Sequence, residues 1–288
     1  MFSNMTPLLF TLSLFGISIA AGVLGSLLGL GGGIIVIPAL TLIFHVDMRF
    51  AIGASIVSVI ATSSGAAAAY VRERMTNLRV AMFLEIATTL GALTGAYLSA
   101  ELAGRWLYVI FGVILAYSAL QMFRKRQEKA GENVPASALA DRLKLHASYY
   151  DQSSDREIAY RVTHVPLGFA LMYIAGLVSG LLGIGSGSLK VPAMDLAMRL
   201  PIKVSTATSN FMIGVTAAAS AGVYFARGDI DPFIAAPVAA GVLVGATLGS
   251  LLLGRLKNHI IRTVFVIVLL WISGQMLWKG LHFHAAIR

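Results

Sequence analysis

The sequence predicts an all-helical protein that crosses a membrane several times and consists of two tandem homologous repeats. Three observations lead to this prediction: the composition, a series of long apolar runs, and self-similarity at one constant offset. Of the 288 residues, 57% are hydrophobic and 12% are charged, and the mean hydropathy is +0.81. A soluble domain has about a quarter of its residues charged, so the composition is that of a membrane protein.

Apolar runs long enough to span a bilayer recur along the whole chain. Each is close to the ~20 residues that cross a hydrocarbon core as a helix. The runs are Leu8–Leu28, Phe50–Val71, Val80–Ala100, Trp106–Phe123, Val165–Leu182, Val204–Phe225, Phe233–Leu253 and Ile260–Leu277. Most Lys and Arg residues lie in the short loops between the runs. The net charge of +9 therefore indicates loops that set topology and meet anionic lipid, and not a nucleic-acid partner.

The two halves of the chain align without gaps at an offset of 154 residues, the separation of Gly22 from Gly176. Matches that involve Gly, Pro and Tyr at a constant offset are hard to obtain by chance in apolar sequence. The same offset pairs Gly31 with Gly185, Gly33 with Gly187, Pro38 with Pro192, Ser55 with Ser209, Thr62 with Thr216 and Tyr70 with Tyr224. We infer a duplication with one transmembrane repeat in residues 1–123 and the other in 164–288.

Each repeat opens with a segment broken by glycines, "SLLGLGGGIIVIP" from Ser26 and "GLLGIGSGSLKVP" from Gly180. The broken segments, Leu8–His45 and Val165–Met198, are too long for one span and too short for two. Either a re-entrant hairpin or an interrupted span fits. A hairpin leaves three crossings per repeat and inverts the second copy, whereas an interrupted span leaves four and keeps the copies parallel. The positive-inside rule favours inversion, because inversion places more of the loop Lys and Arg on the side of the charged central loop.

The central segment, residues 124–163, changes in composition. It begins "RKRQEK" and contains no spanning run. Its pieces "LKLHASYYD" and "REIAYRVTHV" alternate apolar and polar residues around the turn-like "QSSD", which fits a small β-hairpin. A solvated linker fits equally well. In both cases the Arg cluster predicts a cytoplasmic loop. The N-terminus, "MFSNMTPLLF", has no positive stretch, so we do not expect a cleaved signal peptide.

The glycine breaks are the first candidate site. Unwound backbone at membrane depth is tolerated only where it is buried in protein or lines a cavity. Helix ends at such breaks present free N–H groups to anions, and matched breaks in two repeats point to the substrate of a transporter. The breaks comprise Gly31, Gly32 and Gly33 in the first copy and Gly185 and Gly187 in the second. The alternative is that these glycines only allow close helix packing.

A lysine within the second break sharpens this hypothesis. Lys190 corresponds to Val36, so the duplication did not require a charge at this position. Ser186 and Ser188 add hydroxyls to the same copy. An ionisable residue inside a spanning segment is by default a candidate functional residue, and a cation with hydroxyls suits a small oxyanion. The alternative is a lysine that reaches the membrane interface or pairs with Asp195.

The next span of the second copy is unusually polar for a membrane helix. Thr206, Ser209 and Asn210 lie in its opening "KVSTATSNFMIG", and Ser55 is the corresponding polar residue of the first copy. These side chains either complete the anion site or form hydrogen bonds between helices. Glu85 is a possible proton carrier, although an interfacial role is favoured for it. "GLGGG" and "GIGSG" lack the βαβ context of nucleotide-binding loops, so neither an enzyme nor a cofactor is predicted.

The blocks "GLLGIGSGSLKVPAM", "SLLGLGGGIIVIPAL" and "PIKVSTATSNFMIGVTAAASAGVYFARGDIDP", with the "YYD" loop, resemble the TauE/SafE family of sulfite and organosulfonate exporters over nearly the whole chain. The resemblance implies a multi-pass protein of a bacterial or archaeal plasma membrane that exports a small sulfur anion, driven by a proton or sodium gradient. The alternatives are an anion channel, a permease for another small oxyanion or a carboxylate, and a receptor or scaffold that depends on the central loop.

Overall fold

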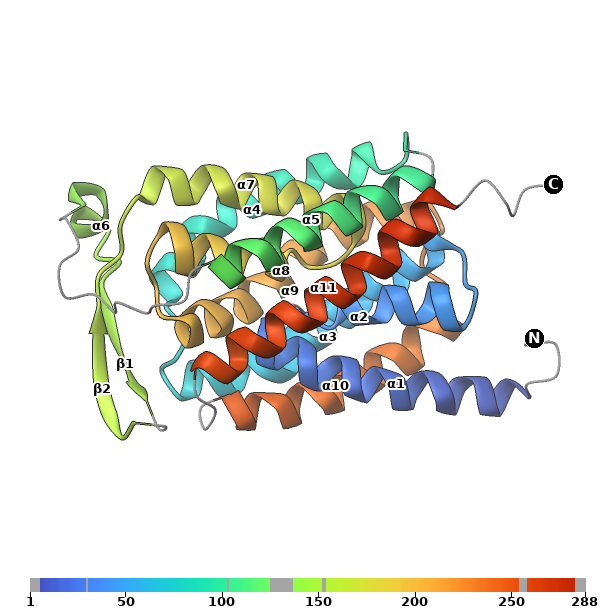
Figure 1. Cartoon of the computed structure of the whole chain (residues 1–288), viewed down its shortest axis with the longest axis horizontal. Helices are drawn as coiled ribbons and strands as arrows, with labels where there is room; N and C mark the ends of the chain where they lie inside the picture. The colour runs from blue at the N-terminus through green and yellow to red at the C-terminus, as the bar shows by residue number, and fades with distance from the viewer. Residues whose placement is uncertain are drawn as a thin grey trace.

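The computed structural model describes residues 6–29, 31–102, 104–124, 137–151, 154–253 and 258–282. Its helices form one elongated bundle (Figure 1). The first repeat contains α1 (Pro7–Leu28), α2 (Gly33–Pro38), the π-helical turn η1 (Ala39–Ile43), α3 (Met48–Arg72), α4 (Leu78–Leu98) and α5 (Gly104–Arg124). The second contains, in the same order, α7 (Val165–Leu182), α8 (Gly187–Pro192), η2 (Ala193–Ala197), α9 (Ile202–Ala226), α10 (Pro232–Leu253) and α11 (Asn258–Leu281).

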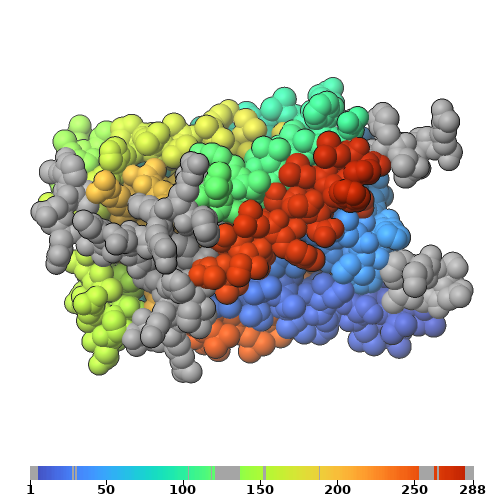
Figure 2. Space-filling view, in the orientation of Figure 1, coloured from blue at the N-terminus to red at the C-terminus, as the bar shows by residue number. Residues whose placement is uncertain are grey.

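Five helices of the described chain, α1, α3, α4, α7 and α10, are long and apolar enough to cross a membrane. Large apolar side chains also cover the outside of the bundle. On α11, which runs across the face shown in Figure 2, Ile267, Leu270, Trp271 and Trp278 are exposed. A surface of this kind is stable in lipid and not in water. The predicted class, an all-α polytopic membrane protein, is confirmed.

Both broken segments double back as hairpins. Gly29 ends α1 in the left-handed conformation at φ 68°, and Gly32 precedes α2, also at φ 68°. The rings of Phe10, near the start of α1, and Phe44, after η1, lie 5.3 Å apart. In the second copy, Thr163 N before α7 donates to Met198 O after η2 at 3.1 Å. Each segment therefore returns to the end of the bundle from which it entered, as a re-entrant hairpin does.

Glycine contacts hold the long helices together in two equivalent pairs. α1 packs along α10, and α7 packs along α4. A Cβ on Gly245 would lie 2.0 Å from Ile19 O, and a Cβ on Gly180 would lie 1.9 Å from Ala92 O. The backbones thus touch where small residues recur. In Figure 1, α1 runs leftward from the N-terminus, and α7 runs rightward from the β-hairpin.

The described part of the central segment contains α6 (Ala138–Arg142) and an antiparallel hairpin of β1 (Ala147–Asp151) and β2 (Arg156–Tyr160) at one end of the bundle (Figure 1). Asn77, the N-cap of α4, donates from Nδ2 to Leu145 O at 2.9 Å and to Tyr160 Oη at 3.0 Å. Burial of Tyr160 raises its pKa to about 12. Between the hairpin and the bundle, Lys203 Nζ at the start of α9 pairs with Asp151 Oδ1 at the end of β1 at 2.5 Å, and both side chains are buried. The hairpin therefore covers the beginnings of α4 and α9.

We expect Lys203→Met to destabilise the protein by about 3–5 kcal/mol, because it removes the cation that pairs with the buried Asp151 carboxylate. The midpoint of thermal unfolding in detergent measures the loss. Adding Asp151→Asn removes the negative charge of the buried carboxylate, so the double variant should recover part of the stability. A double variant no more stable than Lys203→Met would contradict the ion-pair explanation.

Candidate functional site

The two glycine turns meet where α3 crosses α9. A Cβ on Gly31 would lie 2.7 Å from Ile213 Cδ1, and a Cβ on Gly185 would lie 2.7 Å from Val59 Cγ1. Val59 also lies 3.3 Å from the Gly31 position. Gly31 and Gly185 have φ values of 80° and 74°, which a residue with a side chain adopts only with strain. Glycine is thus needed at both turns for conformation as well as for space.

Symmetric hydrogen bonds hold the helix ends that precede the turns. Ser55 Oγ donates to Gly183 O at 2.7 Å, and its counterpart Ser209 donates to Gly29 O at 2.9 Å. Each serine therefore binds the turn of the other repeat. Tyr70 Oη donates to Ser26 O at 3.1 Å, and Tyr224 Oη donates to Gly180 O at 2.6 Å. Carbonyls at a helix end have no partner within the helix, and these side chains satisfy them.

We expect Ser55→Ala and Ser209→Ala each to cost about 1–3 kcal/mol of stability, because each leaves a buried carbonyl without its donor. Ser64→Ala is the matched control, since Ser64 is exposed and donates only within its own helix, to Ile60 O. Thermal unfolding in detergent compares the three variants. Equal midpoints for all three would show that the cross-repeat bonds do not stabilise the turns.

Several polar atoms at the meeting point are buried and have no hydrogen-bond partner within the described chain. They are Ser186 Oγ, Thr206 Oγ1 and Asn210 Oδ1. Ser186 is fully buried and lies in the turn itself at φ 55°. Thr206 contacts the other turn, since a Cβ on Gly29 would lie 3.0 Å from its Cα. Buried polar groups in proteins are normally paired, so each of these atoms calls for a partner such as a water, an ion or a ligand.

The structure thus brings most of the predicted site residues together. Gly32 lies beside Thr62, Gly33 lies beside Ser55 and begins α2, and Gly187 begins α8. The amide of Asn210 donates from Nδ2 to Ser26 O at 2.7 Å. The side chain of Ser188 lies outside the described residues.

Lys190 is fully buried within the helical bundle. Its Nζ donates to Thr216 Oγ1 at 2.6 Å, and the Thr216 hydroxyl lies 2.6 Å from Glu85 Oε1, to which it can donate. Glu85 Oε2 is buried without a partner in the described chain. The sequence favoured an interfacial role for Glu85 and named Asp195 as the alternative partner of Lys190. The structure instead links Lys190 to Glu85 through one hydroxyl.

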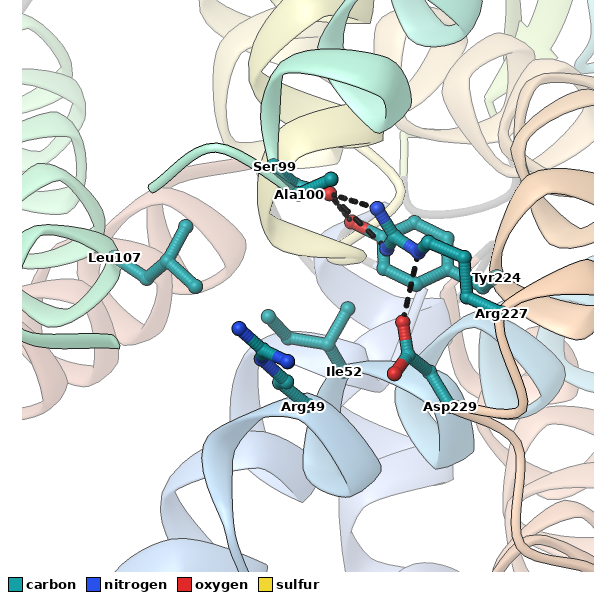
Figure 3. A pocket seen from close by; sticks show the side chains of 8 residues that line it. All are labelled: Arg49, Ile52, Ser99, Ala100, Leu107, Tyr224, Arg227 and Asp229. Carbon is teal, nitrogen blue, oxygen red and sulfur yellow. Dashed lines mark hydrogen bonds and ion pairs between the residues drawn. The ribbon is translucent and has the colours of Figure 1, made fainter. Parts of the chain in front are cut away.

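A small pocket of about 120 Å³ opens at the end of the bundle away from the β-hairpin (Figure 3). It is lined by Arg49, Ile52, Ser99, Ala100, Leu107, Tyr224, Arg227 and Asp229. Arg227 pairs with Asp229 at 2.9 Å and donates to Ser99 Oγ at 3.1 Å. Ile52 also contacts the Gly183 position, and Tyr224 binds Gly180. Two of the lining residues therefore contact the end of α7, which precedes the second glycine turn.

Sequence reasoning did not assign the pocket residues to the site. Arg49 and Arg227 were counted only as loop charges, because nothing local shows that they share a pocket. Tyr224 and Thr216 carried a signal, since the repeat offset pairs each with an identical residue in the first copy.

Comparison with known proteins agrees with this architecture. The profile of the family described as "Sulfite exporter TauE/SafE" matches residues 14–276. The probable membrane transporter protein YunE of Bacillus subtilis is 28% identical over 276 residues, which cover 92% of this chain and 96% of the relative. A probable membrane transporter protein of Xylella fastidiosa strain 9a5c is 27% identical over 91% of this chain and 94% of its own length.

A third relative comes from a plant. "Sulfite exporter TauE/SafE family protein 5" of Arabidopsis thaliana is 25% identical over 62% of this chain and 39% of its own length. No solved structure matches the chain. The family match covers nearly all of the duplicated helical bundle, including both glycine turns, and the chain belongs to the sulfite exporter TauE/SafE family of membrane transporters.

Proposed function

We propose that the protein is a secondary transporter that exports a small sulfur anion, sulfite or an organosulfonate, bound between the two glycine turns. One observation carries the proposal: the buried hydroxyls of Ser186 and Thr206, which lie at the two turns, have no partner within the described chain, and a fully buried lysine follows the second turn on α8. The family description and the printed name of the plant relative support the sulfur anion as substrate.

In this proposal each site residue has a definite task. Lys190 neutralises the anion, and Ser186 and Thr206 donate the hydrogen bonds that they do not make within the protein. Ser209 and Asn210 hold the first turn in place, and Ser55 holds the second. Small oxyanions are bound most strongly where such donors are fixed and water is excluded.

Alternating access follows from the proposed inversion of the repeats. Arg49 and Lys203 are equivalent by the repeat offset, yet Arg49 lines an open pocket and Lys203 is buried under the β-hairpin. The two ends of the bundle therefore differ although the repeats match. Rocking of one repeat against the other would exchange these environments and open the site to the opposite side.

The proposed location is the plasma membrane of a bacterium or archaeon, with the loop of residues 124–163 in the cytoplasm. Inversion then places both termini outside. A reporter enzyme fused after Arg288 should therefore be located, and active, outside the cytoplasm. Activity only in the cytoplasm would contradict the inverted topology.

Transport is tested with purified protein in liposomes. If the protein is a carrier, liposomes loaded with unlabelled sulfite should transiently accumulate radiolabelled sulfite by counterflow. Each binding site that carries unlabelled sulfite out returns inward with labelled sulfite bound. An anion channel gives only equilibration, and a permease for another small oxyanion or a carboxylate gives counterflow with that anion and not with sulfite. A receptor or scaffold gives no flux at all. Any of these last three results would contradict the proposal.

A further inference from the structure

A charge relay joins Lys190 of the second repeat, which is fully buried, to Glu85 of the first repeat, which is partly buried. Lys190 corresponds to Val36, and Glu85 corresponds to Ala239. Val36 packs in an apolar cluster with Val238 and Val242 of α10. The pair of positions on α2 and α10 is apolar. The equivalent pair on α8 and α4 consists of a cation and an anion. The two charges therefore form a unit.

The threonine between the two charges has also changed its role. Thr62, in the first copy, donates to Gly31 O at 3.1 Å and thereby holds the turn. Its counterpart Thr216 accepts from Lys190 Nζ and lies within hydrogen-bond distance of Glu85 Oε1, each at 2.6 Å. A second hydroxyl, Thr89 Oγ1, donates to the same carboxylate oxygen at 3.2 Å. Glu85 is thus held as the counter-charge of Lys190.

Few other ionisable groups lie on the elements around the relay, and Glu85 is the charged group that acts on Lys190. Lys203 and Tyr224, at the two ends of α9, bind Asp151 and Gly180. Arg79, at the start of α4, donates to Lys144 O. The remaining ionisable side chains on α4, α5, α7 and η2 are Tyr97, Arg105, Tyr108, Tyr117, Arg124, Tyr173 and Asp195.

We propose that Glu85 couples anion binding to proton uptake: the substrate anion replaces the Glu85 carboxylate as the counter-charge of Lys190, and Glu85 takes up one proton from solution as the anion binds. This inference rests on the proposed function. A buried cation requires one negative partner, and two anions beside it would leave one charge uncompensated. When the anion leaves, Glu85 returns the proton to solution and its carboxylate again balances Lys190.

The buried oxygen Glu85 Oε2, which has no partner among the described residues, suits this exchange. An unpaired carboxylate oxygen away from water is costly. Protonation removes the negative charge and with it most of this cost. Uptake of the proton and binding of the anion then occur together.

Calorimetric titration of sulfoacetate into the purified wild-type protein tests the inference. Sulfoacetate is fully ionised from about pH 6 to about pH 8, so any proton taken up belongs to the protein. Titrations in buffers of different ionisation enthalpy should give uptake of about one proton, and affinity should fall with rising pH by up to about tenfold per unit. Sulfite is titrated in parallel to test the proposed function separately.

Glu85→Gln removes the titrating group and keeps the side chain close to its original size. This variant should bind sulfoacetate without proton uptake and with an affinity that does not change with pH. Glu101→Gln is the matched control, because Glu101 is an exposed carboxylate just after the same helix. It should behave as the wild type does.

The outcomes separate the two proposals. If the wild type binds sulfoacetate without proton uptake, or if Glu85→Gln keeps the uptake, the coupling role of Glu85 is wrong and the proposed transport function stands. If the wild type binds neither sulfoacetate nor sulfite, the proposed function fails and the coupling fails with it. Should Glu85→Gln not fold, the pH dependence of wild-type affinity decides, because an affinity independent of pH overturns the inference.

Discussion

Lys190→Met is expected to weaken the binding of sulfite and of sulfoacetate by about 30-fold or more, and to abolish measurable flux. Lys190 is fully buried beside the turn that contains Ser186, so the charge it supplies to an anion is not weakened by water. Removing one partner of a buried charge pair costs about 2–5 kcal/mol, and each 1.4 kcal/mol is about a tenfold change in affinity. Calorimetry with the purified variant measures the loss.

A control is needed because Lys190→Met also leaves the Glu85 carboxylate without its cation. The double variant Lys190→Met with Glu85→Gln removes both charges and leaves this pair of positions uncharged, as the equivalent pair Val36 and Ala239 is. We expect the double variant to unfold at a temperature close to that of the wild type and still not bind. Binding by either variant with wild-type affinity would show that Lys190 does not contact the anion.

Gly180→Ala is expected to cause a large loss of stability in the helical bundle. A Cβ at this position would lie 1.9 Å from Ala92 O, and the contact is between the backbones of α7 and α4. No side chain can rotate away, so the two helices must separate along their length. Overpacking of a tight core costs about 1–3 kcal/mol and more where backbone must move. The thermal unfolding midpoint in detergent should fall sharply.

Gly222→Ala, on α9, is the matched control. A Cβ on Gly222 would have no atom within 4 Å. The same change in composition should therefore leave the unfolding midpoint unchanged or raise it slightly, because alanine favours the helix over glycine by roughly 0.5–1 kcal/mol. If both variants lose the same stability, close backbone contact is not what holds α7 to α4.

The sequence was enough to predict the helical class and the meeting of the two glycine turns. The offset that pairs Gly31 with Gly185 implies equivalent places in a duplicated bundle, and matched breaks in repeats converge on one site. Hydropathy alone left the direction of the chain after each break open, and the positive-inside rule favoured the hairpin. The contacts of Phe10 with Phe44 and of Thr163 with Met198 show the hairpin.

The partner of Lys190 could not be predicted for a related reason. Local spacing suggested Asp195, which follows Lys190 on the same segment, whereas Glu85 lies in the other repeat. The two meet only because α4 packs against α7 and α9. The repeat comparison held a usable signal, since Glu85 and Lys190 are both charged where their counterparts are apolar.

The central claim, that an anion binds between the glycine turns beside Lys190, is tested most directly with selenite, a heavier analogue of sulfite with the same pyramidal shape. Crystals of the protein grown with selenite give an anomalous difference map in which selenium marks the bound anion. The claim predicts the strongest peak next to the Lys190 ammonium and the Ser186 hydroxyl. A strongest peak between Arg49 and Arg227 in the outer pocket, with none at Lys190, would contradict it.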